Sequence, residues 1–198
     1  MQVGEGQVKK RPQGGEEFLD AVGREWAALP PLPHLRAQKF LERERTLRSA
    51  FNLAWEHLSE YLRKPTGLSA VDFSCGNGAF LEALRYWGLE VLGVDVQYFE
   101  FLESQRIPYS HHDCKVLPYP LPDKSRDIVT CHGAITFYRG TDWTDVLDEF
   151  GRIARRCIVI TPNSGEVLDE NRHKLNDWCP SEWKRVTSGP TWWKWRAR

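Results

Sequence analysis

The stretch VDFSCGNGAF (residues 71–80) decides the fold of this chain. Its first half is a short apolar run, Gly76 and Gly78 form a turn, and a helical pattern follows. Glycine allows positive φ and lets a ligand approach the backbone closely, and the first amides of a following helix point to the same place. Two glycines also fit an ordinary tight turn between a strand and a helix, so a second feature is needed to indicate a ligand site.

That second feature is the run EVLGVD (residues 90–95), whose last residue lies 95 − 76 = 19 positions after Gly76. An acid at the tip of the second strand, about 20 residues after the glycines, is where the ribose hydroxyls of a nucleotide are bound. The alternative is that Asp95 caps a new helix that follows it directly.

The alternation of short apolar runs and helical patterns continues along the chain. We expect strands at residues 69–73, 90–95, 108–111, 127–131 and 157–161. Helical patterns begin near Gly78, Tyr98 and Asp142. Strands separated in this way by helices are typical of a doubly wound, mostly parallel sheet covered on both faces. The fold class is therefore α/β and Rossmann-like, and its ligand should bind at the carboxyl ends of the strands.

The chain divides into three parts. Residues 1–15 have no periodic apolar pattern, and we expect a flexible tail. Residues 16–64 carry apolar residues at steps of three, four and seven, with a break at the prolines of 30–33, and predict a helical extension. Residues 65–198 form the Rossmann-like core, which ends in a tryptophan-rich segment with a central Gly-Pro step. That segment predicts an antiparallel hairpin.

Composition narrows the function classes. The 198 residues suit one domain with an extension. Lys and Arg together number 27, and Asp and Glu together also number 27, so the net charge is zero. The net charge therefore does not indicate a nucleic-acid partner. There is no apolar run of the roughly 20 residues that span a bilayer. The five cysteines are scattered without a CxxC pair. We expect a cytoplasmic protein with reduced thiols and without a membrane partner; the sequence carries no signal for an oligomeric state.

The motifs resemble those of class I S-adenosylmethionine-dependent methyltransferases of the small-molecule type, similar to methyltransferase domain 11. Residues 71–80 resemble the first motif of that family, and GVD with Asp95 resembles the second. The segment 112–131 is the most specific match, with an aspartate, a Leu-Pro-Tyr step, an acidic turn and a strand that begins Asp-Ile-Val. The segment 145–163 resembles the family's helix with a Leu-x-Glu-x-x-Arg pattern. The resemblance covers about residues 68 to 165.

The resemblance implies S-adenosylmethionine as the cofactor. The residues that it places around this cofactor are Asp72, Ser74, Cys75, Gly76, Gly78, Asp95, Val96, Asp113, Cys114 and Cys131. Asp95 would bind the ribose hydroxyls, Asp113 the adenine amino group and Asp72 the amino group of the methionine portion. Ser74 replaces the family's first glycine, and we expect it to hold a β-like conformation there. A cationic sulfonium ligand tolerates such carboxylates, which would repel a phosphate.

Methyl transfer asks little of side chains beyond positioning and exclusion of water. A general base is useful where the acceptor loses a proton. His132, just past the fourth strand, is the first candidate, and Tyr138 in the same loop is the second. His132 also fits an incidental loop histidine. We expect no metal site, because the histidines and cysteines near residues 111–132 match no usual spacing of zinc ligands.

Other activities remain open on the residues alone. A nicotinamide-dependent dehydrogenase shares the glycine turn, but it would want glycine at Ser74 and has no reason for the Leu-Pro-Tyr step. A methyltransferase-fold binding protein without catalysis and an RNA-directed methyltransferase that uses the basic, tryptophan-rich tail are the alternatives. The leading hypothesis is a methyltransferase that acts on a small-molecule acceptor, with residues 16–64 as a lid over the cleft.

Overall fold

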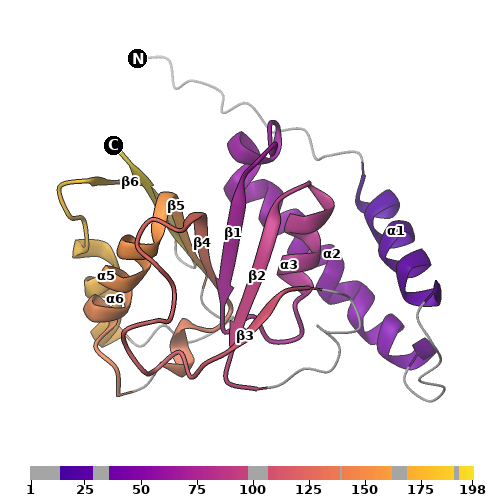
Figure 1. The fold of residues 1–198 in the computed structure, drawn as a ribbon, viewed down its shortest axis with the longest axis horizontal. Coiled ribbons are helices and arrows are strands. Elements are labelled where there is room, and N and C mark those ends of the chain that lie inside the picture. The colour runs from indigo at the N-terminus through magenta and orange to yellow at the C-terminus, as the bar shows by residue number, and fades with distance from the viewer. Residues whose placement is uncertain (1–13, 29–35, 98–106, 139, 162–168, 190–191) are drawn as a thin grey trace.

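The computed structural model describes residues 14–28, 36–97, 107–138, 140–161, 169–189 and 192–198. Its centre is one sheet of seven strands in the order β3-β2-β1-β4-β5-β7-β6 (Figure 1). The strands are β1 (Ser69–Phe73), β2 (Glu90–Asp95), β3 (Tyr109–His111), β4 (Arg126–His132), β5 (Ala154–Thr161), β6 (Trp183–Gly189) and β7 (Trp192–Ala197). The first five pair in parallel, and β7 pairs antiparallel with both neighbours. The doubly wound α/β fold and the terminal hairpin are thus confirmed.

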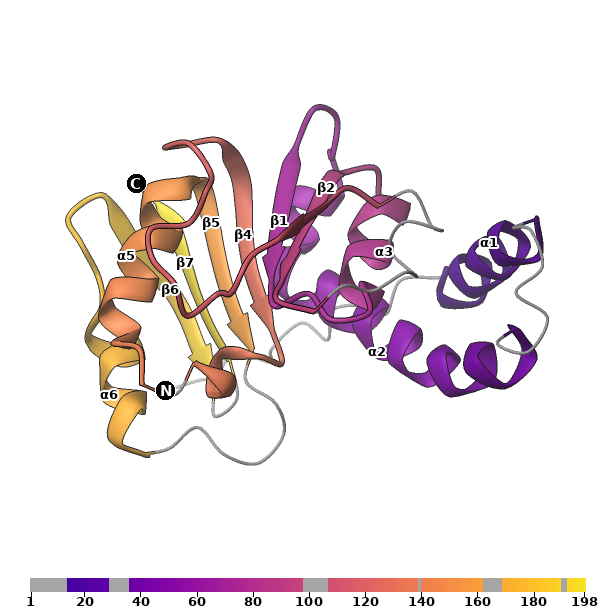
Figure 2. The same ribbon diagram turned by 60° about the horizontal axis from the view of Figure 1, so that its bottom comes forward.

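Helices cover both faces of this sheet. They are α1 (Gly15–Ala28), α2 (Arg36–Leu62), α3 (Ala79–Tyr86), the 3-10 helix η1 (Ile135–Phe137), α5 (Trp143–Ile153) and α6 (Asp169–Asp177). Helices α2 and α3 lie on one face, and α5 and α6 lie on the other (Figures 1 and 2). The helices that we expected from Glu16 and Asp142 are confirmed. The expected helix near Tyr98 and most of the expected tail lie outside the described residues.

The N-terminal extension packs through aromatic rings. Phe18 of α1 stacks on Phe51 of α2 with 5.0 Å between the ring centroids, and Phe51 stacks on Trp87 after α3 at 5.3 Å. Figure 2 shows α1 on the outer side of this layer, away from the sheet. Helix α2 makes most of the contact with α3, and α1 adds a smaller one, because the ring of Phe18 meets that of Tyr86 edge to face at 5.1 Å. Within the described residues, no helix is both long and apolar enough to cross a membrane.

Three of the four tryptophans of the C-terminal hairpin belong to the core, and Trp192 is half-buried. Trp183, Trp193 and Trp195 are fully buried, and Trp195 donates a hydrogen bond to the carbonyl of Trp178 at 2.9 Å. Their rings cannot stack on nucleic-acid bases from inside the protein. The hairpin completes the sheet. Its three buried rings are not available to stack on RNA bases, which argues against the RNA-directed alternative.

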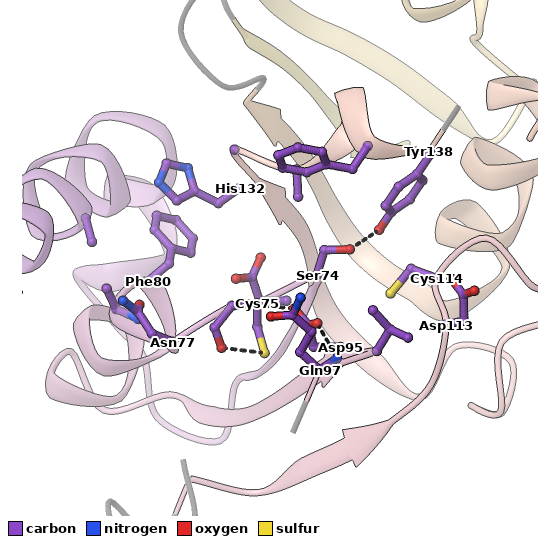
Figure 3. A pocket seen from close by; sticks show the side chains of 18 of the residues that line it. Ser74, Cys75, Asn77, Phe80, Asp95, Gln97, Asp113, Cys114, His132 and Tyr138 are labelled. Carbon is purple, nitrogen blue, oxygen red and sulfur yellow. Dashed lines mark hydrogen bonds between the residues drawn. The ribbon is translucent and has the colours of Figure 1, made fainter. Parts of the chain in front are cut away.

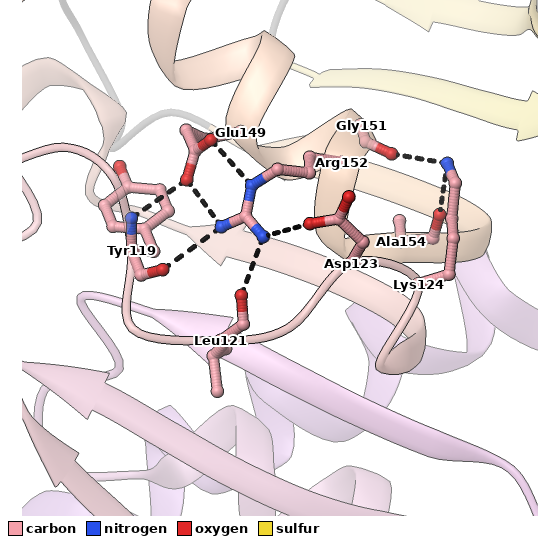
Figure 4. A network of polar contacts seen from close by, with 8 residues as sticks. All are labelled: Tyr119, Leu121, Asp123, Lys124, Glu149, Gly151, Arg152 and Ala154. Carbon is pink, nitrogen blue, oxygen red and sulfur yellow. Dashed lines mark hydrogen bonds and ion pairs between the residues drawn. The ribbon is translucent and has the colours of Figure 1, made fainter.

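A polar network fixes the loop between β3 and β4 (Figure 4). Arg152 of α5 forms two 2.7 Å hydrogen bonds with Glu149, one with Asp123 at 2.7 Å, and one with the carbonyl of Tyr119 at 3.1 Å. The hydroxyl of Tyr119 then donates to the carbonyl of Cys114 at 2.9 Å. The most specific motif residues thus have a structural task, because they hold the loop whose first residues reach the site described next.

Candidate active site

A cavity of about 710 Å³ lies at the carboxyl ends of β1, β2 and β4, where the strand order changes direction (Figure 3). This is the place at which doubly wound sheets bind ligands, and the volume suits a small molecule. Most of the sequence-predicted residues line it. They are Asp72, Ser74, Cys75, Gly76, Asp95, Val96, Asp113, Cys114, His132 and Tyr138.

Two of the expected cofactor residues do not line the cavity. Gly78 has a φ of 75° and caps α3, and its amide donates to the carbonyl of Cys75 at 2.9 Å. Gly78 therefore stabilises the turn without forming part of the cavity wall. Cys131 is fully buried among the apolar side chains under α5, and the wall at this point is formed by residues 132–134. The side chain of Cys131 therefore belongs to the core, and the expected position of its backbone beside the cofactor stays a prediction.

The glycine turn and the acid at the end of β2 are in direct contact. The amide of Gly76 donates to Oδ2 of Asp95 at 2.8 Å, and the amide of Gln97 donates to Oδ1 at 2.9 Å. The spacing of 19 residues therefore brings the two strand ends together. Each carboxylate oxygen accepts one backbone hydrogen bond and has a lone pair left for a hydroxyl group of a ligand. Asp95 thus organises the turn and remains able to bind.

Ser74 holds a left-handed conformation, with a φ of 54°. The expected β-like conformation is wrong. The turn off β1 requires positive φ, which glycine adopts freely and serine adopts at a cost of about 1–2 kcal/mol. The side chain offsets part of this cost, because its Oγ lies 3.0 Å from the hydroxyl of Tyr138. The serine is therefore compatible with the turn, and Tyr138 is its partner.

Asp72 is a buried carboxylate on the wall of the cavity. Oδ1 accepts a hydrogen bond from Thr130 Oγ1 at 2.7 Å, across from β1 to β4. Burial raises the pKa of Asp72 to about 7, against hydrogen bonds from Thr130 and from the backbone of His132. Within the described residues no basic side chain forms an ion pair with it. A buried group of this kind in a cavity indicates a functional site.

The two candidate bases differ in geometry. His132 shares a 2.5 Å hydrogen bond through Nδ1 with the Thr161 hydroxyl, and its ring stacks on Phe80 at 4.8 Å. Burial lowers the pKa of His132 to about 4, so the ring is neutral at pH 7 and is a weak base. Tyr138 is buried, its hydroxyl is engaged by Ser74, and burial raises its pKa well above the ordinary value. The geometry favours His132 and gives Tyr138 a positioning task.

Sequence reasoning missed other residues of the wall. Thr46 and Ala50 of α2, Phe80 of α3 and Phe137 of η1 all line the cavity. The four-residue step from Thr46 to Ala50 places both on one face of α2, and this spacing was the available signal. The spacing does not show that α2 turns this face toward the cavity, because that depends on how the helix packs. Among the described residues, no group of three His, Cys, Asp or Glu side chains forms a set of metal ligands.

Comparison with known proteins relates this cavity to a family. Residues 71–157 match the family model described as a methyltransferase domain. No curated protein sequence matches the chain. Among solved structures, the fold is similar to that of magnesium protoporphyrin IX methyltransferase from Synechocystis PCC 6803 with bound S-adenosylmethionine. That match has a TM-score of 0.55 at 14% identity and covers 98% of this chain and 100% of that one.

Two further structures have the same fold. One is an S-adenosylmethionine-dependent methyltransferase from Archaeoglobus fulgidus, with a TM-score of 0.54 at 18% identity over 80% of this chain and 98% of that one. The other is a protein from Methanococcus maripaludis described by the same activity, with a TM-score of 0.53 at 13% identity over 100% and 97%. At such identities the likeness establishes the fold and leaves the acceptor open.

Proposed function

We propose that this chain is an enzyme that binds S-adenosylmethionine in the cavity of Figure 3 and methylates a small-molecule acceptor. Its residues 71–157 match the methyltransferase domain model, and its sheet has the class I fold. One observation carries the proposal. Three carboxylates from separate segments, Asp72, Asp95 and Asp113, line one cavity beside a glycine turn.

The lining residues fit the cofactor chemically. Asp95 offers lone pairs for ribose hydroxyls, and Asp113 lies with Cys114 at the far end of the cavity, where an adenine amino group needs an acceptor (Figure 3). Asp72 is a buried carboxylate that suits an ammonium group. Lys115 is the one lysine or arginine among the described lining residues. A pyrophosphate beside the glycine turn would find little positive charge among the described lining residues, which disfavours a dinucleotide.

When bound, the cofactor supplies a methyl group on a positively charged sulfur, which is a strong electrophile. The chain's own residues then have two tasks. Phe80 and the neighbouring apolar wall exclude water, and the neutral imidazole of His132 accepts a proton where the acceptor releases one. Holding the acceptor in line supplies most of the remaining rate.

The N-terminal extension, residues 16–64, is in our proposal the lid over this cavity. Thr46 and Ala50 of α2 line it, and Glu16 of α1 binds Arg48 of α2 at 2.6 Å. No described residue of α1 lines the cavity. The lid function therefore falls to α2, with α1 as its support.

Calorimetry with S-adenosylhomocysteine tests the cofactor assignment. Replacement of Asp95 by alanine removes a charged acceptor, and such hydrogen bonds contribute about 1.5–3 kcal/mol. We expect the affinity of Asp95→Ala to fall about 10- to 100-fold. Asp145→Ala, an exposed aspartate on α5, is the matched control and should bind as the wild type does.

The same titration separates the alternatives. NAD⁺ should not bind at millimolar concentration, because the described lining offers its pyrophosphate little positive charge. If NAD⁺ binds and S-adenosylhomocysteine does not, the chain is a dehydrogenase-like protein and the proposal is wrong. If neither binds, the chain uses the fold as a binding module without this chemistry.

A further inference from the structure

The cavity has two ends of different chemistry. In Figure 3, Asp113 and Cys114 lie at one end, His132 and Phe80 lie at the other, and Ser74 and Asp95 lie between them. Ala50 of α2 belongs to the same buried cluster as Phe80, and α2 packs along α3. Thr46 lies one turn before Ala50 on the same face of α2 and also lines the cavity. Phe137 of η1 follows His132 by five residues and its amide donates to the carbonyl of Ala134 at 2.9 Å, so we place it at this end too. We propose that this second end is the acceptor subsite and that it takes an uncharged aromatic compound. This inference rests on the proposed function, because the carboxylate end must be filled by the cofactor.

The walls of the subsite carry no net charge. Thr46, Ala50, Phe80 and Phe137 are uncharged by type, and burial lowers the pKa of His132 to about 4, so its ring is neutral at pH 7. Among the described residues, no lysine or arginine lines this end; Lys115 adjoins Asp113 at the opposite end. A carboxylate or phosphate would lose its hydration here without gaining a cation, which is unfavourable.

A positively charged acceptor fits no better. The carboxylate within reach is that of Asp72, which is buried and is assigned to the ammonium group of the cofactor. Two cations in one buried site repel each other. A cationic amine also lacks the lone pair that accepts a methyl group. The uncharged form of an acceptor is therefore the form that this end favours.

The subsite is also aromatic. The rings of Phe80 and His132 stack with an interplanar angle of 25° at 4.8 Å, so one wall is already an ordered pair of parallel rings. Phe80 is 3% exposed, whereas Phe137 is 62% exposed although it lines the same cavity. A large apolar ring left open to solvent beside a cavity gains most from a flat apolar ligand, which covers it. Phe137 is thus the residue that we expect the acceptor to bury.

Three para-substituted phenols of similar size test the inference. They are 4-methylphenol, which is neutral, 4-hydroxybenzoate, which is anionic, and 4-hydroxybenzylamine, which is cationic near pH 7. Their binding is measured by saturation-transfer NMR and calorimetry on full-length protein saturated with S-adenosylhomocysteine. We expect 4-methylphenol to bind at least tenfold more tightly than either charged probe.

Two variants locate the binding. Phe137→Ala should weaken 4-methylphenol about tenfold and leave S-adenosylhomocysteine binding unchanged, whereas Val186→Ala, another exposed apolar residue, should change neither. Thr46 is exposed, so Thr46→Arg adds a cation to the subsite without disturbing the core. It should tighten 4-hydroxybenzoate at least tenfold. Thr144→Arg, an equally exposed position on α5, should not.

The outcomes are distinguishable. If S-adenosylhomocysteine fails to bind, the proposed function fails and this inference fails with it. If S-adenosylhomocysteine binds but none of the three phenols does, the acceptor class is wrong while the cofactor assignment stands. The acceptor class is also wrong if 4-hydroxybenzoate binds the wild type as tightly as 4-methylphenol. The same conclusion holds if Phe137→Ala binds 4-methylphenol with wild-type affinity.

Discussion

Two buried aspartates on neighbouring strands have opposite environments. Asp127 begins β4 at the amino end of the sheet, and its carboxylate accepts hydrogen bonds from the amide of Ser69 at 3.0 Å, from Arg155 at 3.0 Å and from Arg156 at 2.9 Å. Asp72 lies on β1 toward the carboxyl end, with a hydrogen bond from Thr130 and, among the described residues, no ion pair. Both side chains are almost fully buried.

The pKa values follow these environments. Burial raises the pKa of Asp127, but the hydrogen bonds from Ser69 and the charges of Arg155 and Arg156 outweigh burial and hold the pKa below its ordinary value. Burial raises the pKa of Asp72 to about 7. At the amino end of the sheet, the charge of Asp127 is compensated by the chain's own arginines. At the carboxyl end it leaves a buried carboxylate without a cation, which we interpret as the place of a ligand.

The largest effect should come from Asp72→Asn, which keeps the acceptor for Thr130 and removes the charge. The unfolded state loses the Asp72 proton near pH 4 and the folded state near pH 7, so the wild type loses stability as the pH rises between these values. One pKa unit corresponds to about 1.4 kcal/mol. The free energy of unfolding of Asp72→Asn should therefore exceed that of the wild type by about 4 kcal/mol at pH 8.

Urea unfolding at pH 5 and pH 8 checks this prediction. The difference between the variant and the wild type should shrink at pH 5. A variant that is less stable than the wild type at pH 8 would show that the chain itself compensates the charge of Asp72, and the contrast between the two ends would disappear.

Asp127→Asn should act in the opposite direction. Its folded-state pKa is lowered, so the ionised form stabilises the protein above the ordinary pKa, and this contribution is lost as the pH falls. The arginines are 46% and 57% exposed, so solvent screens them. We expect a loss of about 2 kcal/mol at pH 7, mainly from the hydrogen bonds to the buried charge.

The same urea titrations measure this loss. It should decrease toward pH 3, and the affinity of the folded variant for S-adenosylhomocysteine should be unchanged. A variant that folds normally but loses cofactor affinity would show that Asp127 contributes to cofactor binding. That result would contradict the distinction between the two ends of the sheet.

Backbone strain at Ser74 is a smaller cost at the carboxyl end. Ser74→Ala loses the hydrogen bond to Tyr138 and keeps the positive φ, whereas Ser74→Gly loses the bond and relieves the φ. The glycine variant should be more stable than the alanine variant by about 1 kcal/mol. Thermal unfolding of the pair measures this difference. Equal melting temperatures would mean that the turn at residue 74 carries no strain.

The positions of the strand ends at the carboxyl side of the sheet could be predicted from the sequence, and the reasons are local. The apolar runs at residues 69–73 and 90–95 and the glycines after the first run determine where the strands end, so Asp72 and Asp95 had to lie near one edge of the sheet. Residues such as Phe137 and Thr46 could not be predicted, because they reach the cavity through the packing of η1 and α2. The hydrogen-bond partner of Ser74 is Tyr138, which is 64 residues away and could not be identified from the spacing.

The pairing of Asp127 with two arginines was equally hidden. Asp127 matched the family motif at the start of the fourth strand, and nothing in the spacing shows that Arg155 and Arg156, at the start of β5, turn toward it. Parallel register places the starts of β4 and β5 side by side, and that contact arises only on folding. Sequence patterns thus predicted where the strands end. They did not predict which side chains pair between neighbouring strands.

The central claim is that Asp72 is held without a cation for a cationic ligand, and the affinity for S-adenosylhomocysteine as a function of pH tests it most directly. With a pKa of about 7, Asp72 is about 90% protonated at pH 6 and must release that proton to pair with the ligand's ammonium group. The wild-type affinity should therefore rise about tenfold from pH 6 to pH 8, while His132, with a pKa of about 4, stays neutral throughout. Asp72→Asn should bind more weakly at pH 8 and show no such rise. Equal affinities with the same flat profile for the wild type and Asp72→Asn would contradict the account.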